Sequence, residues 1–225
     1  MDFIFMLTRN DQTVEDCLEV LDAVAGLGIG HLGFKDIGVE LETLKTLNRA
    51  IKAAGAVSYM EVVSTTPEAC LRSAEAAVEI GVDRLLGGTD AAAILEVLAG
   101  SGIGFYPFPG LPIGHPTLLG GAPEQIAEHC RDYMAMGCAG VDLLAFRAID
   151  AEPLELVAAA REALGQGPEA GALICAGSVD SPERIRPLKA AGVDAFTIGS
   201  AAFDGSFSPN KVLLRSQLCD ILAAC

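Results

Sequence analysis

The chain has 225 residues, close to the roughly 200 to 250 that one closed α/β barrel requires. Apolar residues make up 51% of it and charged residues 20%, so the chain can bury a large core and is not disordered. Acidic residues outnumber basic ones by 30 to 15. The resulting field repels phosphate backbones and anionic lipids, so we expect neither a nucleic acid nor a membrane as a partner.

The seven cysteines contain no C-x-x-C pair, and most of them lie in apolar stretches. This pattern is typical of reduced core residues and predicts a cytoplasmic protein. The first seven residues are apolar apart from Asp2, an acid where a signal peptide carries Lys or Arg. The run is also too short to cross a bilayer. We expect residues 1–7 to form a buried strand.

A glycine followed by a short, continuously apolar run recurs along the chain. The glycines are expected to end helices in the left-handed conformation, and the runs are typical of strands buried on both faces. Together with residues 1–7 there are eight such runs. The other seven are residues 28–34, 55–60, 81–86, 102–106, 140–144, 171–175 and 192–196.

Helix-start signals separate these runs: a capping side chain, a proline at the first helical position and an acid in the first turn. They occur near residues 13, 66, 90, 122, 150 and 181. Eight βα units with right-handed crossovers predict one (β/α)8 TIM barrel domain over residues 1–225, in preference to an open doubly wound sheet. Residues 107–121 form the longest irregular stretch, which we expect to be a lid on the carboxyl face of the barrel.

A phosphate site is predicted after the last two strands. The first of these ends in Gly177 and Ser178, and the second ends in Gly199, Ser200 and Ala201. Glycines let backbone amides approach an anion, and serine hydroxyls complete a cradle. We expect one short extra helix directly after Gly199, whose positive end would face the anion.

Over residues 173–203 the sequence resembles the ribulose-phosphate-binding class of TIM barrels, through Ala176-Gly177-Ser178 and Ile198-Gly199-Ser200-Ala201. Elsewhere only the architecture is shared. That class includes the histidine and tryptophan pathway isomerases and synthases, thiamine phosphate synthase and acylmannosamine-6-phosphate epimerase. The resemblance implies a small phosphorylated metabolite as partner and leaves the reaction open.

The strongest catalytic candidates are Lys35 and Glu61. Lys35 ends an apolar run, and Glu61 lies within the buried run 57–64, so each needs a partner or a function. A buried carboxylate beside a lysine suits proton abstraction next to a carbonyl, with Lys35 balancing the enediolate. A structural ion pair, with Glu61 or Asp36 as the partner of Lys35, is the alternative.

Three further residues have weaker cases. Arg147 ends the run 140–146 and is expected to orient a carboxylate or to supplement the phosphate cradle, with Arg9 as a second orienting group. His115 lies on the long loop and is expected either to act as a mobile acid or to be simply solvated. A Schiff-base aldolase would have to use Lys35, because the lysine positions usual in such barrels are not lysines here.

Other acids and motifs are assigned no chemistry. Asp83, Asp142 and Asp194 each follow a Gly-Val pair, so we expect them at strand starts on the stability face of the barrel. The Gly-x-Gly-x-x-Gly pattern at residues 28–33 opens a strand instead of a helix, so it is not a dinucleotide fingerprint. No metal-ligand motif is present.

The sequence therefore predicts an isomerase, epimerase or lyase acting next to the carbonyl of a phosphorylated sugar or sugar acid, without a cofactor or metal. A barrel that binds a phosphometabolite without converting it is the alternative, and a pyridoxal phosphate or flavin enzyme is a third reading. The apolar surface of residues 211–219 is enough to pack on the barrel and on a second copy, which leaves a homo-oligomer open.

Overall fold

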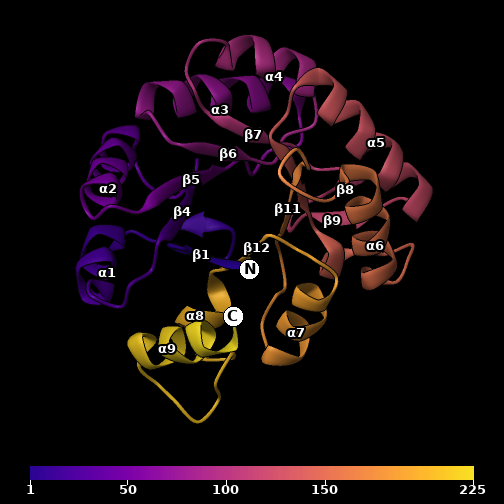
Figure 1. Ribbon diagram of the computed structural model, residues 1–225. Helices are drawn as coiled ribbons and strands as arrows, with labels where there is room; N and C mark the ends of the chain where they lie inside the picture. The colour runs from indigo at the N-terminus through magenta and orange to yellow at the C-terminus, as the bar shows by residue number, and fades with distance from the viewer.

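In the computed structural model, which describes residues 1–225, eight parallel strands curl into a nearly closed barrel (Figure 1). The two strands at the ends of the sheet order, residues 104–106 and 140–143, are joined by two backbone hydrogen bonds. Ala139 N–H donates to Phe105 O (2.9 Å), and Asp142 N–H donates to Pro107 O (3.0 Å). The predicted (β/α)8 fold is confirmed. The barrel strands are β1 (Asp2–Met6), β4 (His31–Lys35), β5 (Val57–Glu61), β6 (Arg84–Leu86), β7 (Gly104–Tyr106), β10 (Gly140–Leu143), β11 (Ala172–Cys175) and β12 (Ala195–Ile198).

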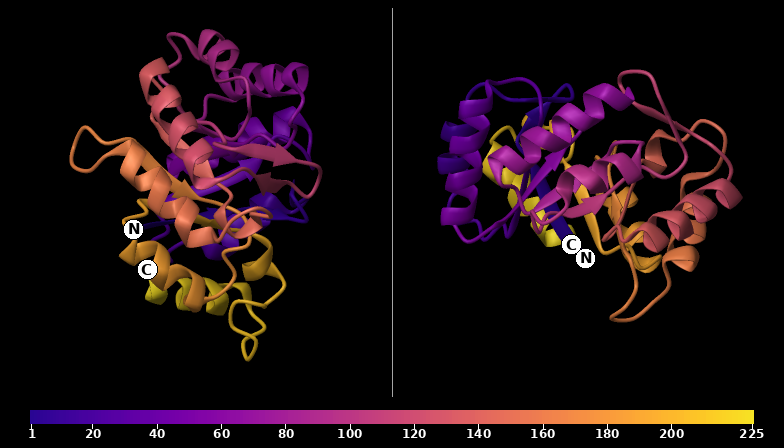
Figure 2. Two further views of the ribbon diagram at one scale, coloured as in Figure 1. Left: turned by 90° about the vertical axis from the view of Figure 1, so that its right-hand side faces the viewer. Right: turned by 90° about the horizontal axis from the view of Figure 1, so that it is seen from above.

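Helices surround the strands, and the two chain ends lie close together (Figures 1 and 2). The short extra helix expected after the last strand is present as α8, and the final helix, α9, starts at Leu214. No helix has both the length and the apolar character needed to cross a membrane. The helices are α1 (Cys17–Val24), α2 (Leu41–Ala53), α3 (Pro67–Ile80), α4 (Ala91–Leu98), α5 (Pro123–Met136), α6 (Pro153–Leu164), α7 (Pro182–Ala190), α8 (Ser200–Phe203) and α9 (Leu214–Ala224).

Two antiparallel hairpins interrupt the βα alternation. The first, β2 (Thr8–Arg9) with β3 (Gln12–Thr13), follows β1 directly, so α1 starts later than the signal near residue 13 suggested. The second, β8 (Leu111–Ile113) with β9 (Leu118–Gly120), forms most of the stretch that we expected to be a lid. Both hairpins lie in loops that follow barrel strands, on the face where the candidate site lies.

The interior of the barrel changes character along its axis. At the amino-terminal end, the Arg84 guanidinium lies over the rings of Tyr59 and Tyr106, 5.7 and 5.5 Å from their centroids, and Tyr59 Oη contacts His31 Nδ1 at 2.9 Å. Aliphatic side chains such as Ile4 and Ile174 fill the space above. This polar and aromatic layer closes the lower end, so the cavity at the other end has a solid floor.

Two of the three strand-start acids have the structural role that we expected. Asp83 Oδ2 accepts hydrogen bonds from Ser58 N–H (2.9 Å) and Ser58 Oγ (3.0 Å), and Asp194 Oδ2 accepts one from Leu173 N–H (2.7 Å). Each carboxylate thus holds the start of a neighbouring strand.

The expectation was wrong for Asp142, which is the third residue of β10 and is fully buried. The glycine that ends the preceding helix is Gly137 (φ +94°), not Gly140. Gly140 lies inside the strand, where a Cβ would come 2.0 Å from Ala172 O. Asp83 and Asp194 directly precede their strands, whereas Asp142 lies three positions further along, as the third residue of its strand. Its side chain is therefore inside the barrel.

We expect Asp83→Ala to lower the free energy of unfolding by about 1–3 kcal/mol, because it leaves the Ser58 N–H without its acceptor. Burial alone would raise the pKa of Asp83, but hydrogen bonds from Lys52 and Ser58 outweigh it and lower that pKa. A depressed pKa gives stability that is present above the unfolded-state value and is lost at lower pH. Urea unfolding should therefore show a difference from wild type at neutral pH that shrinks below about pH 4.

Candidate active site

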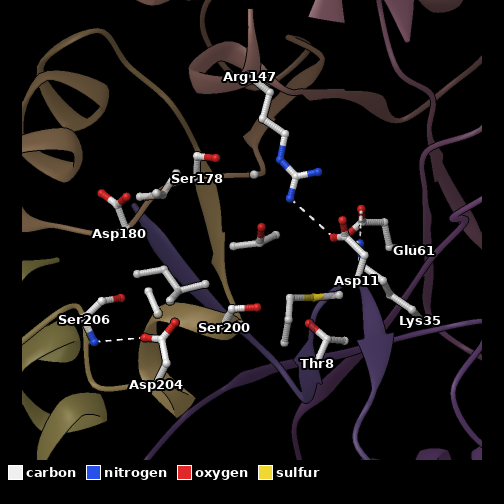
Figure 3. A pocket seen from close by; sticks show the side chains of 17 residues that line it. Thr8, Asp11, Lys35, Glu61, Arg147, Ser178, Asp180, Ser200, Asp204 and Ser206 are labelled. Atoms are coloured by element: carbon white, nitrogen blue, oxygen red, sulfur yellow. Dashed lines mark hydrogen bonds and ion pairs between the residues drawn. The ribbon is translucent and has the colours of Figure 1, made fainter. Parts of the chain in front are cut away.

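A cavity of about 240 Å³ opens at the carboxyl ends of the strands. Asp11, Lys35 and Glu61 lie on one side of it, and Ser178 and Ser206 lie on the other side with Asp180 and Asp204 (Figure 3). Pockets for drug-sized ligands usually measure about 300–1,000 Å³, so this cavity suits a smaller molecule. Lys35, Glu61, Arg147, Gly177, Ser178, Gly199, Ser200 and Ala201, all predicted from the sequence, line it.

Lys35 and Glu61 occupy paired positions on the neighbouring strands β4 and β5. Because both side chains point into the barrel, Lys35 Nζ lies 3.1 Å from Glu61 Oε1. The residues are only 5% and 7% exposed, so each charge depends on the other for compensation. Glu61 was one of the two partners that the sequence offered for Lys35. Asp36, the other partner considered for Lys35, accepts instead from Val63 N–H (3.1 Å) and from Ser73 Oγ.

Asp11 is a member of the cluster to which sequence reasoning assigned no role. It sits at the tip of the β2–β3 hairpin, where Asn10 (φ +52°) and Asp11 (φ +58°) are both left-handed, as a two-residue type I′ turn requires. Its Oδ1 lies 2.8 Å from Lys35 Nζ and 3.3 Å from Arg147 Nη2. The Asn-Asp dipeptide was the available signal, since both residues tolerate this conformation.

The ion pairs determine the protonation states. Burial alone would lower the pKa of Lys35, but the charges of Glu61 and Asp11 outweigh it and raise that pKa. Burial would likewise raise the pKa of Asp11, yet Lys35 and Arg147 hold it below its usual value. Lys35 is therefore a cation and Asp11 a carboxylate near neutral pH.

Across the cavity, the loop after β11 presents main-chain amides. Gly177 (φ +74°) and Ser178 (φ +57°) are both left-handed, and the N–H groups of Gly177, Ser178, Val179 and Gly199 donate to no protein acceptor. A Cβ on Gly177 would lie 2.5 Å from Arg147 Nε, so glycine lets the Arg147 side chain lie over this loop. Such a concave set of free N–H groups is suited to an anion.

The two halves of the cavity are joined by the β2–β3 hairpin. Asn10 N–H donates to Ser200 Oγ (3.2 Å), while the Arg9 guanidinium donates to Phe203 O (3.3 Å) and lies 5.4 Å from the Phe203 ring centroid. Arg9 thus anchors the hairpin on α8 and does not line the cavity. The Ser200 hydroxyl accepts from Asn10 and keeps its own proton available for a ligand.

Two more carboxylates, Asp180 and Asp204, line the cavity and were not predicted. Asp180 Oδ2 pairs with Arg184 Nη1 at 3.0 Å, and Asp204 Oδ1 accepts from Ser206 N–H at 2.9 Å. With Asp11 and Glu61 the lining contains more carboxylates than cations. An anion bound here is consequently held by amides and hydroxyls, with Arg147 and Lys35 compensating carboxylates that are already present.

His115 does not join the other candidates. It is exposed in the turn between β8 and β9 and lines a separate cavity of about 760 Å³ together with Asp36 and Arg72. The hairpin reaches the candidate site instead through Thr117 O, which accepts from Arg147 Nη1 at 3.3 Å. The loop was identified correctly as part of this face, but the hairpin points its histidine elsewhere.

Neither a protein-family model nor a curated protein sequence matches the chain. Solved structures match its fold. A structure described as native KDPGal is 15% identical, with 100% of this chain and 94% of that chain covered and a TM-score of 0.69. The orotidine 5'-phosphate decarboxylase of Pyrococcus horikoshii is 12% identical, with 99% and 98% covered and a TM-score of 0.66.

The N-acetylmannosamine-6-phosphate 2-epimerase of Clostridium perfringens is 9% identical, with 98% and 93% covered and a TM-score of 0.63. The resemblance to phosphate-binding TIM barrels is thereby confirmed for the fold. Two of these three proteins are named as enzymes that act on phosphorylated compounds. At such low identity the likeness extends to the architecture alone, so the chemistry must be argued from the side chains.

The ion-pair cluster makes a prediction that needs no substrate. Because both carboxylates raise the pKa of Lys35, that pKa should fall in Asp11→Asn and also in Glu61→Gln. Nitrogen NMR of the labelled Lys35 amine measures it. Asp180→Asn, which removes a carboxylate paired with Arg184, serves as the control. Equal pKa values in all four proteins would contradict the cluster.

Proposed function

We propose that this protein is an enzyme that binds a small phosphorylated sugar or sugar acid and moves a proton, or breaks a bond, next to its carbonyl group. The observation that carries the proposal is the position of the buried Lys35–Glu61 pair opposite a loop with free main-chain amides, in one cavity of about 240 Å³. A base beside a cation suits the removal of a proton next to a carbonyl, which is a first step open to isomerases, epimerases and lyases.

Glu61 acts as the base in this proposal. Its carboxylate takes a proton from the carbon beside the substrate carbonyl, and the electron pair of the C–H bond moves to the carbonyl oxygen as an enediolate. The Lys35 ammonium balances that developing negative charge. Returning a proton to the same carbon on the other face gives an epimer. Protonating the former carbonyl carbon, while the neighbouring hydroxyl passes its proton to the enediolate oxygen, gives an isomer. Re-forming the carbonyl while a group on the next carbon departs with the electron pair of its bond gives a lyase product.

The protonation of Lys35 favours this role over imine formation. A Schiff base requires a neutral amine, and neighbouring cations or an apolar pocket usually supply it by lowering the lysine pKa. Here burial acts in that direction, but Glu61 and Asp11 reverse it and raise the pKa. The imine reading through Lys35 is accordingly the weaker one.

The phosphate group of the substrate is assigned to Gly177, Ser178, Gly199, Ser200 and Ala201. The N–H groups of Gly177, Ser178 and Gly199 have no protein acceptor, and the Ser200 hydroxyl has a proton to donate. Arg147 lies over Gly177 and reaches Asp11, so it spans the distance between phosphate and reacting carbon. It is assigned an orienting role, without direct participation in proton transfer.

Inorganic phosphate is the first ligand to test by titration calorimetry. Ser200→Ala should weaken its binding roughly fivefold, because one hydrogen bond is worth about 1 kcal/mol. Asp204→Asn should strengthen binding by removing a negative charge from the lining while keeping an oxygen for Ser206 N–H. Ser101→Ala, near the opposite end of the barrel, is the matched control. No binding of phosphate to any variant would refute the cradle.

The chemical role of Glu61 is tested by hydrogen exchange into sugar phosphates in deuterated water, followed by NMR. Glu61→Gln should lower the exchange rate about 10²- to 10⁴-fold, the usual loss on removing a general base. Phosphate affinity should stay within a few fold, since Glu61 lies across the cavity from the cradle. Glu155→Gln, on the exposed side of α6, is the control.

An unchanged exchange rate in Glu61→Gln would refute the assignment of Glu61 as the base. Phosphate binding without any exchange, across a panel of sugar phosphates, would instead identify the protein as a phosphometabolite-binding barrel.

A further inference from the structure

Asp142 is a buried acid that the proposed chemistry does not use. It is 0% exposed, and neither of its carboxyl oxygens has a hydrogen-bond partner, which is true of no other buried carboxyl group in the protein. It shares its register position with Ile174, whose side chain fills the barrel interior, so Asp142 points inward beneath the cavity. Burial of a carboxyl group without a partner is costly, which makes this position one that demands an explanation.

The charges around Asp142 are already balanced without it. Lys35 contacts the carboxylates of both Asp11 and Glu61, and Arg147 contacts Asp11. These two cations and two anions cancel, so a third carboxylate in the barrel interior would be uncompensated. Burial first, and then the negative charge of Glu61, raise the pKa of Asp142 well above its usual value, although Lys35 and Arg147 act in the opposite direction.

The groups that face Asp142 come from four elements. They are Glu61 on β5, Lys35 on β4, Arg147 in the short helix η1 (Ala145–Arg147) and the Cys175 thiol on β11. Burial, together with the charge of Asp142, raises the pKa of Cys175 to about 12, so that thiol stays neutral. Glu61 and Asp142 are therefore two carboxyl groups close enough for the charge of Glu61 to raise the pKa of Asp142.

We propose that Asp142 is a positioning residue that acts through Lys35 and Glu61: as a neutral carboxylic acid it leaves Glu61 as the one ionised carboxylate that reaches Lys35 from the barrel interior. Ionised Asp142 would draw the Lys35 ammonium down toward the floor and away from Glu61. The Lys35–Glu61 pair is then assembled only while Asp142 holds its proton, which sets an upper pH limit on the site. This inference rests on the proposed function for its catalytic meaning, and its structural part stands without it.

Carbon NMR of the full-length chain with labelled aspartate and glutamate carboxyls tests the inference. Asp142→Asn identifies the resonance and replaces a neutral acid by a neutral amide of the same shape. In wild type we expect the Asp142 carboxyl to titrate at higher pH than the other aspartates, and in Glu61→Gln to titrate at lower pH than in wild type. The Lys35 amine signal should shift as Asp142 ionises, and that shift should be lost in Asp142→Asn.

Two results would overturn the inference: titration of Asp142 near the ordinary aspartate value of about 3.9, or a Lys35 signal that is indifferent to its ionisation. The Glu61→Gln measurement keeps Asp142 intact, so it remains decisive if Asp142→Asn does not fold. An ordinary titration in a chain that binds inorganic phosphate refutes the role of Asp142 alone. A displaced titration in a chain that binds no phosphate refutes the cradle and leaves the role of Asp142 standing.

Discussion

The site depends on one constraint: an ammonium group is held inside the mouth of an apolar barrel and must be compensated there. Lys35 is 5% exposed, and Glu61 on the neighbouring strand supplies one carboxylate. The second, from Asp11, requires the chain to turn back immediately after β1, and the tight β2–β3 hairpin makes that turn. Because Asn10 of the hairpin donates to Ser200 Oγ, the turn that compensates the lysine also contacts α8 on the other side of the cavity.

The same constraint explains the unusual state of the barrel interior below the cavity. Two cations and two carboxylates are in contact, and Asp142 beneath them has no hydrogen-bond partner. In water a further carboxylate would simply ionise, but in this dry region ionisation is opposed by burial and by Glu61. A neutral acid is the state that these electrostatics favour.

Features set by local pattern were predictable from the sequence. Continuous apolar runs and helix-start signals such as Pro67, Pro123 and Pro182 predicted the barrel. The need of a buried charge for a partner made Glu61 a candidate to contact Lys35, and the two residues are paired in the sheet. The glycines and serines after β11 and β12 were placed correctly around one cavity.

Features set by register were not predictable in this way. The Gly-Val-Asp tripeptide reads the same at three positions, yet the choice of Gly137 over Gly140 as the helix-ending residue moves Asp142 into the barrel. The position of Asp11 beside Lys35 depends on a two-residue turn that the sequence analysis did not recognise. The orientation of His115 depends on how the β8–β9 hairpin folds. For Asp142 the deciding feature is the close approach of Gly140 to Ala172 O, which lies far away in the sequence.

The charge of the cavity determines what kind of selectivity it can have. The cavity lining contains two cations, Lys35 and Arg147, and four carboxylates, those of Asp11, Glu61, Asp180 and Asp204. A phosphorylated ligand would therefore gain little from net electrostatic attraction, and the acidic chain as a whole adds none. Its binding must come from N–H and O–H groups whose directions are fixed by left-handed residues such as Gly177 and Ser178. A site of this kind would discriminate by geometry more than by charge, since an anion that cannot reach those donors meets a lining with more carboxylates than cations. Under the proposed function, the cations would then serve the reacting end of the substrate, where Lys35 contacts Glu61.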